Sequence, residues 1–186
     1  MDRYICLQPL YKTPGPGVEL ETLERLCVDL LDVFGFDCSI AHRLEMPDDA
    51  YLSIRDQYLA SEVLVYVKSH NHRGAHRVLA VTDRDLCAEG LNFVFGQAEL
   101  GGRFAIISTH RLRGSTTVGD GRLYYLRVLK EAIHELGHTF GLVHCDDMLC
   151  IMYSSNTLED TDLKGPDFCH DCRLKLDRYL QMLIYR

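Results

Sequence analysis

The chain has 186 residues, of which 47% are apolar and 25% are charged, a composition that predicts one globular domain over residues 1–186. The formal net charge of −7, with the basic residues scattered, argues against nucleic acid or an anionic membrane as a partner. No apolar run approaches the ~18 residues of a membrane span, and the start of the chain lacks a signal-peptide pattern. A cytoplasmic, reducing location and a monomeric state are therefore expected.

Hydrophobic periodicity predicts alternating strands and helices. Strands are indicated by β-branched and aromatic residues, and helices by apolar residues at helical spacing. In chain order we expect a strand at 4–9, a helix at 18–34 that ends at Gly35, a strand at 36–44, a helix at 54–68, strands at 77–82, 91–95 and 104–108, and helices at 121–139 and 173–183. This order predicts an α/β domain with about five strands in one sheet.

Two polar segments between these elements could suggest metal ligands. Residues 69–76 contain three histidines beside Asn71 and Gly74, so a solvated loop is expected there. Asp83 and Asp85 follow a predicted strand and are expected to lie in a polar turn.

The eight cysteines need an explanation other than disulfides if the protein is kept reduced. Four lie far apart among apolar neighbours, which predicts small buried core residues; these are Cys6, Cys27, Cys38 and Cys87. The other four crowd the last third of the chain, with four, eighteen and two residues between successive members; these are Cys145, Cys150, Cys169 and Cys172. Two short pairs around a long excursion are typical of tetrahedral zinc, and four thiolates leave no place for water, so this zinc is expected to be structural.

Two alternatives stay open for this group of four. The cysteines could form disulfides instead of binding a metal. His170, which lies inside the second pair, could also replace one cysteine as a ligand.

The sequence H-E-L-G-H-T-F-G-L-V-H runs from His134 to His144, at the end of the predicted helix 121–139. Residues four apart share one helix face, so His134 and His138 can bind one zinc ion. Glu135 lies beside that face, where it can approach a zinc-bound group without being a ligand. Gly141 can adopt the left-handed conformation that ends a helix, which lets the chain return His144 as the third ligand. The open fourth position is typical of a catalytic zinc.

A glutamate could replace His144 as the third ligand, as it does in another class of zinc proteases. Glu159 lies 21 residues after His138. However, residues 154–157 are poor helix formers, and Gly165-Pro166 closes the region soon afterwards. His144 is therefore the favoured third ligand.

The pattern H-E-x-x-H-x-x-G-x-x-H resembles the zinc motif of metzincin proteases. Met152, in C-I-M-Y-S, resembles the methionine of the metzincin Met-turn, an apolar floor under the three histidines. The cysteines that follow narrow the resemblance to the archaemetzincins.

This resemblance implies a metzincin-like α/β (α+β) fold with a mixed twisted sheet, an active-site helix, a helix-packed N-terminal part and a zinc-stapled C-terminal loop plus helix. It implies two zinc ions per chain, one catalytic and one structural, and an edge strand bordering the cleft near residues 92–98. It also implies peptide or protein substrates.

The motifs together predict a zinc metallopeptidase in which zinc activates a water molecule and Glu135 acts as general base. Because His144 and Cys145 are adjacent, one loop would serve both metals. Two other functions remain open: a zinc amidase acting on non-peptide substrates, and a zinc-binding interaction module without turnover. The presence of Glu135 argues against the second, since a pure binding site needs no base beside an open zinc position.

Overall fold

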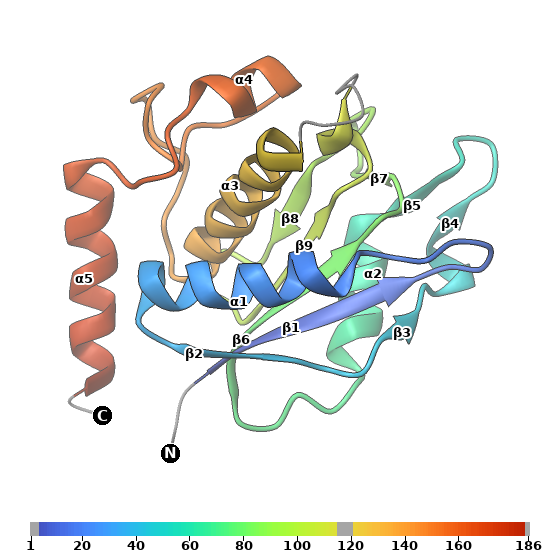
Figure 1. Cartoon of the computed structure of the whole chain (residues 1–186), viewed down its shortest axis with the longest axis horizontal. Helices are drawn as coiled ribbons and strands as arrows, with labels where there is room; N and C mark the ends of the chain where they lie inside the picture. The colour runs from blue at the N-terminus through green and yellow to red at the C-terminus, as the bar shows by residue number, and fades with distance from the viewer. Residues whose placement is uncertain (1–3, 115–120, 185–186) are drawn as a thin grey trace.

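The structure of the chain is a computed structural model that describes residues 4–114 and 121–184 (Figure 1). Its main sheet has six strands in the order β2-β1-β6-β9-β8, with β3 paired to β1 on the same edge as β2. Every pair is parallel except β8, which runs antiparallel to β9. The strands are β1 (Tyr4–Tyr11), β2 (Asp37–Ile40), β3 (Leu44–Glu45), β6 (Ala75–Thr82), β8 (Gly96–Ala98) and β9 (Phe104–Ser108).

The remaining elements surround this sheet. A second, three-stranded sheet is formed by β4 (Tyr51–Leu52), β5 (Gln57–Leu59) and β7 (Leu86–Cys87). The helices are α1 (Leu20–Phe34), α2 (Ala60–Lys68), α3 (Gly121–Thr139), α4 (Leu158–Leu163) and α5 (His170–Ile184), with short 3₁₀ turns at η1 (Asp48–Ala50) and η2 (Arg111–Arg113). Within the part of the chain that the structure describes, no helix combines the length and apolar character needed to cross a bilayer.

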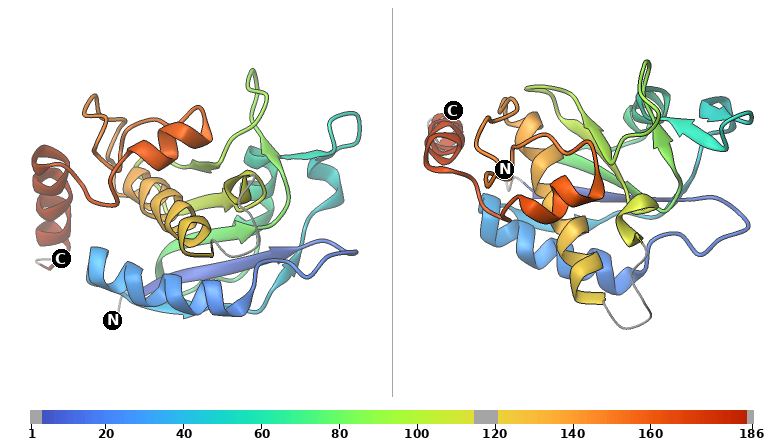
Figure 2. Two further views of the ribbon diagram at one scale, coloured as in Figure 1. Left: turned by 45° about the horizontal axis from the view of Figure 1, so that its top comes forward. Right: turned by 90° about the horizontal axis from the view of Figure 1, so that it is seen from above.

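Helices cover both faces of the main sheet (Figure 2). The first core joins α1 and α3 to one face, where β1 contributes Ile5 and Leu7. The second joins α2 to the opposite face, where β1 contributes Cys6 and Leu10. Because its two faces are both buried, β1 is apolar at nearly every position rather than at alternate ones.

The predicted α/β class and mixed sheet are confirmed, and the helix at 121–139 has the expected bounds. The helix expected at 54–68 begins only at Ala60, because Tyr58 pairs with Leu86 and the Gln57 side chain donates to the Asp85 carboxylate. The strand expected at 36–44 is split into β2 and β3. The strand expected at 91–95 is wrong: that segment has a single bridge, between Val94 and Leu86, and the strand forms at β8.

The dispersed cysteines behave in two ways. Cys6 and Cys87 are buried thiols, as expected. Cys27 and Cys38 are only partly buried, and they form a disulfide between α1 and β2, so the prediction of buried core thiols is wrong for this pair. Their Cα atoms lie 5.0 Å apart, a separation suited to a disulfide, but this proximity arises only when β2 returns to pair with β1.

The two polar segments also differ in part from expectation. His72 is buried rather than solvated, since its imidazole lies 3.1 Å from the Gln8 side chain. The three histidines of this segment do not gather into a metal-binding group within the described residues. Asp85, in the turn after β6, is held by two hydrogen bonds from Arg111.

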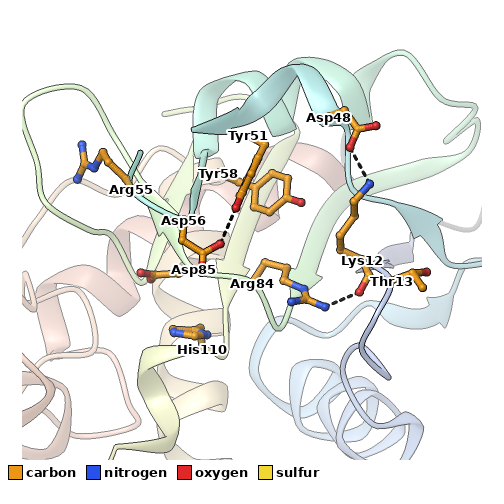
Figure 3. A pocket seen from close by; sticks show the side chains of 10 residues that line it. All are labelled: Lys12, Thr13, Asp48, Tyr51, Arg55, Asp56, Tyr58, Arg84, Asp85 and His110. Atoms are coloured by element: carbon orange, nitrogen blue, oxygen red, sulfur yellow. Dashed lines mark hydrogen bonds and ion pairs between the residues drawn. The ribbon is translucent and has the colours of Figure 1, made fainter. Parts of the chain in front are cut away.

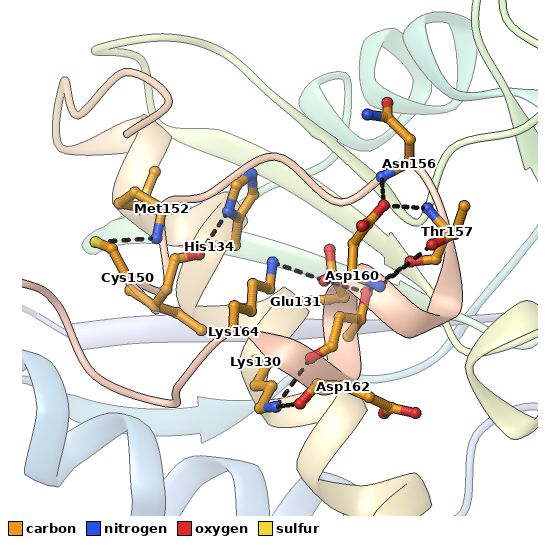
Figure 4. Close-up of polar contacts among 12 residues, drawn as sticks. Lys130, Glu131, His134, Cys150, Met152, Asn156, Thr157, Asp160, Asp162 and Lys164 are labelled. Carbon is orange, nitrogen blue, oxygen red and sulfur yellow. Dashed lines mark hydrogen bonds and ion pairs between the residues drawn. The ribbon is translucent and has the colours of Figure 1, made fainter. Parts of the chain in front are cut away.

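Helix α4 is fixed to α3 by polar contacts (Figure 4). Arg127 on α3 donates two hydrogen bonds of 2.6 Å to the Asp162 carboxylate. The Lys130 ammonium donates to the carbonyls of Thr161 and Asp162 at the end of α4, where the helix dipole favours a cation. These contacts fix the segment between the two cysteine pairs to the helix that carries the histidine motif.

A buried ion pair continues this attachment. The Lys164 ammonium lies 3.0 Å from the Glu131 carboxylate, and the two side chains are 0% and 3% exposed. Thr161 also donates its hydroxyl to Glu131. A buried charge is tolerated only with such a partner, so each of the two side chains depends on the other.

We expect Lys164→Met to lower the free energy of unfolding by about 3–5 kcal/mol, because it leaves the Glu131 carboxylate buried without its cation. Urea denaturation at fixed zinc concentration measures this change. The double variant Lys164→Met/Glu131→Leu should recover most of the loss, while Lys175→Met, at an exposed position of α5, should change little. A loss no larger for Lys164→Met than for Lys175→Met would contradict the pairing.

Candidate metal centre

Three histidines meet at the end of α3. His134 and His138 lie one helical turn apart, and His144 follows the turn at Gly141, whose φ is +87°. One ring nitrogen from each histidine lies within 4.8 Å of the others. This arrangement brings together the three residues that the sequence motif proposes as ligands.

Hydrogen bonds to main-chain carbonyls orient the two helical histidines. Nδ1 of His134 donates to the Ile151 carbonyl at 2.8 Å, and Nδ1 of His138 donates to the Leu142 carbonyl at 2.7 Å. Burial lowers the pKa of both imidazoles, well below the ordinary value for His134. Each ring is therefore neutral with its lone pair on Nε2, the form that binds a metal.

The spacing of these nitrogens fits zinc. The Nε2 atoms of His134 and His138 are 3.1 Å apart. Two Zn–N bonds of about 2.0–2.1 Å at a tetrahedral angle would separate the nitrogens by about 3.3 Å. Three neutral imidazoles form the donor set of a tetrahedral site with one position left open.

Glu135 is buried beside this group, with 6% of its surface exposed. Burial raises its pKa well above the ordinary range, the charge of Glu131 raises it further, and Lys164 opposes both effects. The carboxyl group lines a cavity of about 360 Å³ together with the three histidines and the edge strand β8. Its side chain can therefore reach whatever occupies that cavity.

Gly96, the first residue of β8, makes room for Glu135. A Cβ atom at Gly96 would lie 2.6 Å from Cγ and 2.7 Å from Oε1 of Glu135, and 2.7 Å from the Ile106 carbonyl oxygen. The sequence motifs do not identify Gly96. Its one signal is a glycine in a strand, which often marks a close approach by another group.

Met152 lies directly against the histidine helix and is fully buried. A Cβ atom at Gly137, between the two helical histidines, would meet the Met152 sulfur at 2.5 Å. The Met152 thioether therefore fills the space that the missing side chain of Gly137 leaves open. A larger residue at Gly137 would displace it. Met152 thus lies against the helix that carries His134 and His138; its role as the Met-turn floor stays a prediction.

The four C-terminal cysteines form a second group, with their sulfurs within 4.8 Å of one another. The sulfurs of Cys145 and Cys169 are 3.8 Å apart, too far for a disulfide bond of about 2.05 Å. Zn–S bonds of about 2.3 Å at a tetrahedral angle would separate two sulfurs by about 3.8 Å. The group therefore fits zinc, and all four residues are free thiols.

The surrounding backbone supports a charged sulfur at Cys150. The amides of Met152 and Cys169 donate to its sulfur at 3.4 Å and 3.3 Å. Neither alternative ligand finds support here: His170, the alternative for the cysteine group, and Glu159, the alternative for the histidine group, belong to no metal-binding group of the described residues. Glu159 lies exposed on α4.

The peptide bond between His144 and Cys145 joins the two groups. The Cys145 amide donates to the Met152 carbonyl at 3.0 Å. Cys150 is two residues before Met152 and one before Ile151, whose carbonyl holds His134. The cysteine group is thus attached to His144, to the methionine floor and to the hydrogen bond that orients His134.

Comparison with known proteins agrees with this geometry. The family model "Peptidase family M54" matches residues 38–178. A protein named archaemetzincin from Methanopyrus kandleri is 46% identical over 140 residues, which cover 75% of this chain and 77% of the relative.

Two solved structures have the same fold. The crystal structure of the archaemetzincin from M. kandleri has a TM-score of 0.83 and 37% identity, covering 97% of both chains. A crystal structure described as a zinc-dependent peptidase from Methanocorpusculum labreanum has a TM-score of 0.77 and 29% identity, covering 92% of this chain and 99% of the other. From the match to most of its length and from these identities, the chain belongs to peptidase family M54, the archaemetzincins, and is a zinc metallopeptidase.

Proposed function

We propose that the chain hydrolyses peptide bonds in the cleft formed by His134, His138, His144, Glu135 and β8, with one catalytic and one structural zinc ion. The observation that carries this proposal is the convergence of three neutral imidazoles beside a buried carboxyl group in one open cavity. A pure metal-storage site would need neither the open position nor the carboxyl group.

The residues of the site have different roles in peptide hydrolysis. Zinc, when held by the three histidines, lowers the pKa of water and polarises a carbonyl group. Glu135 takes the proton from the attacking water and delivers it to the nitrogen of the leaving amine. Gly96 leaves room for the Glu135 side chain against the edge strand, and the free edge of β8 offers main-chain groups along which an extended peptide can align.

The four cysteines have a different role. A closed shell of thiolates leaves no position for substrate or water, so Cys145, Cys150, Cys169 and Cys172 hold a structural ion. This ion fixes the segment that carries His144 and Met152. We therefore expect two zinc ions per chain.

Glu135→Gln should lower peptide hydrolysis by about 10²–10⁴-fold, the usual contribution of a general base, while the zinc content stays constant. A quenched-fluorescent peptide library and elemental analysis measure the two quantities. Glu159→Gln, at the exposed position that competes with His144 as a third ligand, is the matched control and should keep both activity and zinc. Small amides tested in parallel separate peptidase from amidase activity. Full activity in Glu135→Gln would show that another group moves the proton.

Gly96→Ala should lower activity by about tenfold or more with zinc retained, because a Cβ at this site displaces the general base and the main-chain Ile106 carbonyl cannot retreat. Gly121→Ala is the control, since a Cβ there meets no atom of the described residues within 4 Å. Kinetics and zinc content are measured for both variants. Equal activity in the two would mean that Glu135 does not depend on Gly96.

Cys150→Ser should impair both metal sites although it does not contact the histidines. A structural zinc contributes an apparent ~10–16 kcal/mol, so its loss frees the segment carrying His144 and Met152. His144→Ala should lose only the catalytic ion and keep most of the stability. Zinc stoichiometry and thermal melting distinguish the two variants. A tight catalytic zinc with normal turnover in Cys150→Ser would mean that the sites are independent.

A further inference from the structure

A cavity of about 460 Å³ lies where the segments after β1 and β6 separate (Figure 3). Lys12 and Thr13 follow β1, Arg84 and Asp85 follow β6, and His110 follows β9. The rest of the wall comes from Asp48 in η1 and from the hairpin of β4 and β5. None of the lining residues also lines the histidine cleft.

The sheet topology places this cavity at a switch point. After β1 the chain turns to α1, which covers one face of the sheet. After β6 it turns to β7, whose Leu86 packs with α2 on the opposite face. The crevice between two parallel strands whose connections leave to opposite faces is the usual ligand site of an open α/β sheet.

One side of the cavity carries the exposed carboxylate of Asp56, which forms no ion pair among the described residues, although Arg55 lines the same cavity. Asp56 is the one non-glycine residue with positive φ, at +51°, among the described residues. Tyr51 donates its hydroxyl to Oδ1 of Asp56 at 2.7 Å, which leaves Oδ2 for another donor. The neighbouring Asp85 is already neutralised by Arg111, so Asp56 is the anion available to a ligand.

The other side carries a cation. Arg84 donates through Nη2 to the carbonyls of Lys12 and Pro14, and its Nε lies 3.5 Å from Asp83. Nη1 is left for a ligand. Arg84 is thus ion-paired with Asp83, at a longer distance than Lys12 is with Asp48 and Glu45. Figure 3 shows Asp56 and Arg84 on opposite sides of the space below the two tyrosines.

The roof of the cavity is aromatic. The rings of Tyr51 and Tyr58 lie 5.1 Å apart at a tilted angle, and Tyr51 is partly exposed to the cavity mouth. Such rings offer apolar surface to a small side chain. The volume suits a ligand of the size of an amino acid.

We propose that this cavity binds a small zwitterion with an apolar side chain, as in a free α-amino acid. The ammonium group lies at Asp56, the carboxylate at Arg84 and the side chain against Tyr51 and Tyr58. A simple anion bound at Arg84 would be repelled by Asp56, and a simple cation bound at Asp56 would be repelled by Arg84. A ligand with both charges satisfies both groups.

The test is a titration of the zinc-loaded chain with L-phenylalanine and with L-leucine, followed by calorimetry and by backbone amide NMR. Shifts should concentrate at residues 12–13, 51–58, 84–85 and 110. L-Phenylalaninamide lacks the carboxylate and N-acetyl-L-phenylalanine lacks the ammonium, so each should bind about tenfold or more weakly. Because free amino acids also coordinate zinc, the titration is repeated on His144→Ala, which should bind as well as the wild type.

Two variants separate the charges. Asp56→Asn keeps the acceptor for Tyr51 and tolerates the left-handed backbone, yet should weaken binding about tenfold or more; Asp32→Asn, exposed on α1, is its control. Arg84→Gln should weaken binding similarly, with Arg178→Gln on α5 as its control. Arg84 also holds the loop after β1, so its variant is first checked by thermal melting, and Asp56→Asn decides the result if Arg84→Gln does not fold.

The proposal is overturned if neither amino acid binds at about 10 mM, well beyond the range of specific weak binding. Equal binding of the amide or the N-acetyl compound would also overturn it, as would unchanged affinity in Asp56→Asn. Loss of binding in His144→Ala would assign the amino acid to the histidine cleft instead.

Discussion

The polar side chains on one side of α3 are buried and therefore need hydrogen-bonding or charged partners. Most of the molecule is arranged so that these partners are present. Lys130, Glu131, His134 and Glu135 occupy less than two turns of one helix, and all are buried. Burying such groups without partners would cost several kcal/mol each. The partners of Lys130, Glu131 and His134 come from the C-terminal third: the carbonyls that end α4, Lys164 and the Ile151 carbonyl, while Glu135 lines the cleft.

This requirement explains why the segment after α3 is held so firmly. It contributes Phe140, Leu142, Ile151 and Met152 to the first core, and it contains one short helix, α4, before α5. The buried ion pair, the contacts of Arg127 and Lys130, and the four cysteines add to this apolar packing. Catalytic geometry and local stability therefore depend on the same contacts.

The sequence predicts those parts of the site whose chemistry is local. His134 and His138 are related by helix periodicity, Gly141 by its position at the helix end, and the cysteine pairs by their spacing. The long strands β1, β6 and β9 are also predicted, because their buried runs are apolar. The sequence cannot show which residues, distant along the chain, are brought into contact by strand pairing. Gly96 reaches Glu135 and Cys27 reaches Cys38 only after strands distant along the chain have paired, and Lys164 carries no local sign that it is buried.

The late position of Lys164 has a consequence for synthesis of the chain. The ribosome releases α3 with its buried Glu131 and Glu135 before it releases the cation and the last two cysteines. While α3 emerges, the sheet strands β1, β6, β8 and β9 are already outside and can pair. Until residues 164–172 have emerged, α3 therefore remains loosely docked or hydrated. Completion of the metal centre therefore comes after synthesis of α3, because Lys164 and the last two cysteines follow it along the chain.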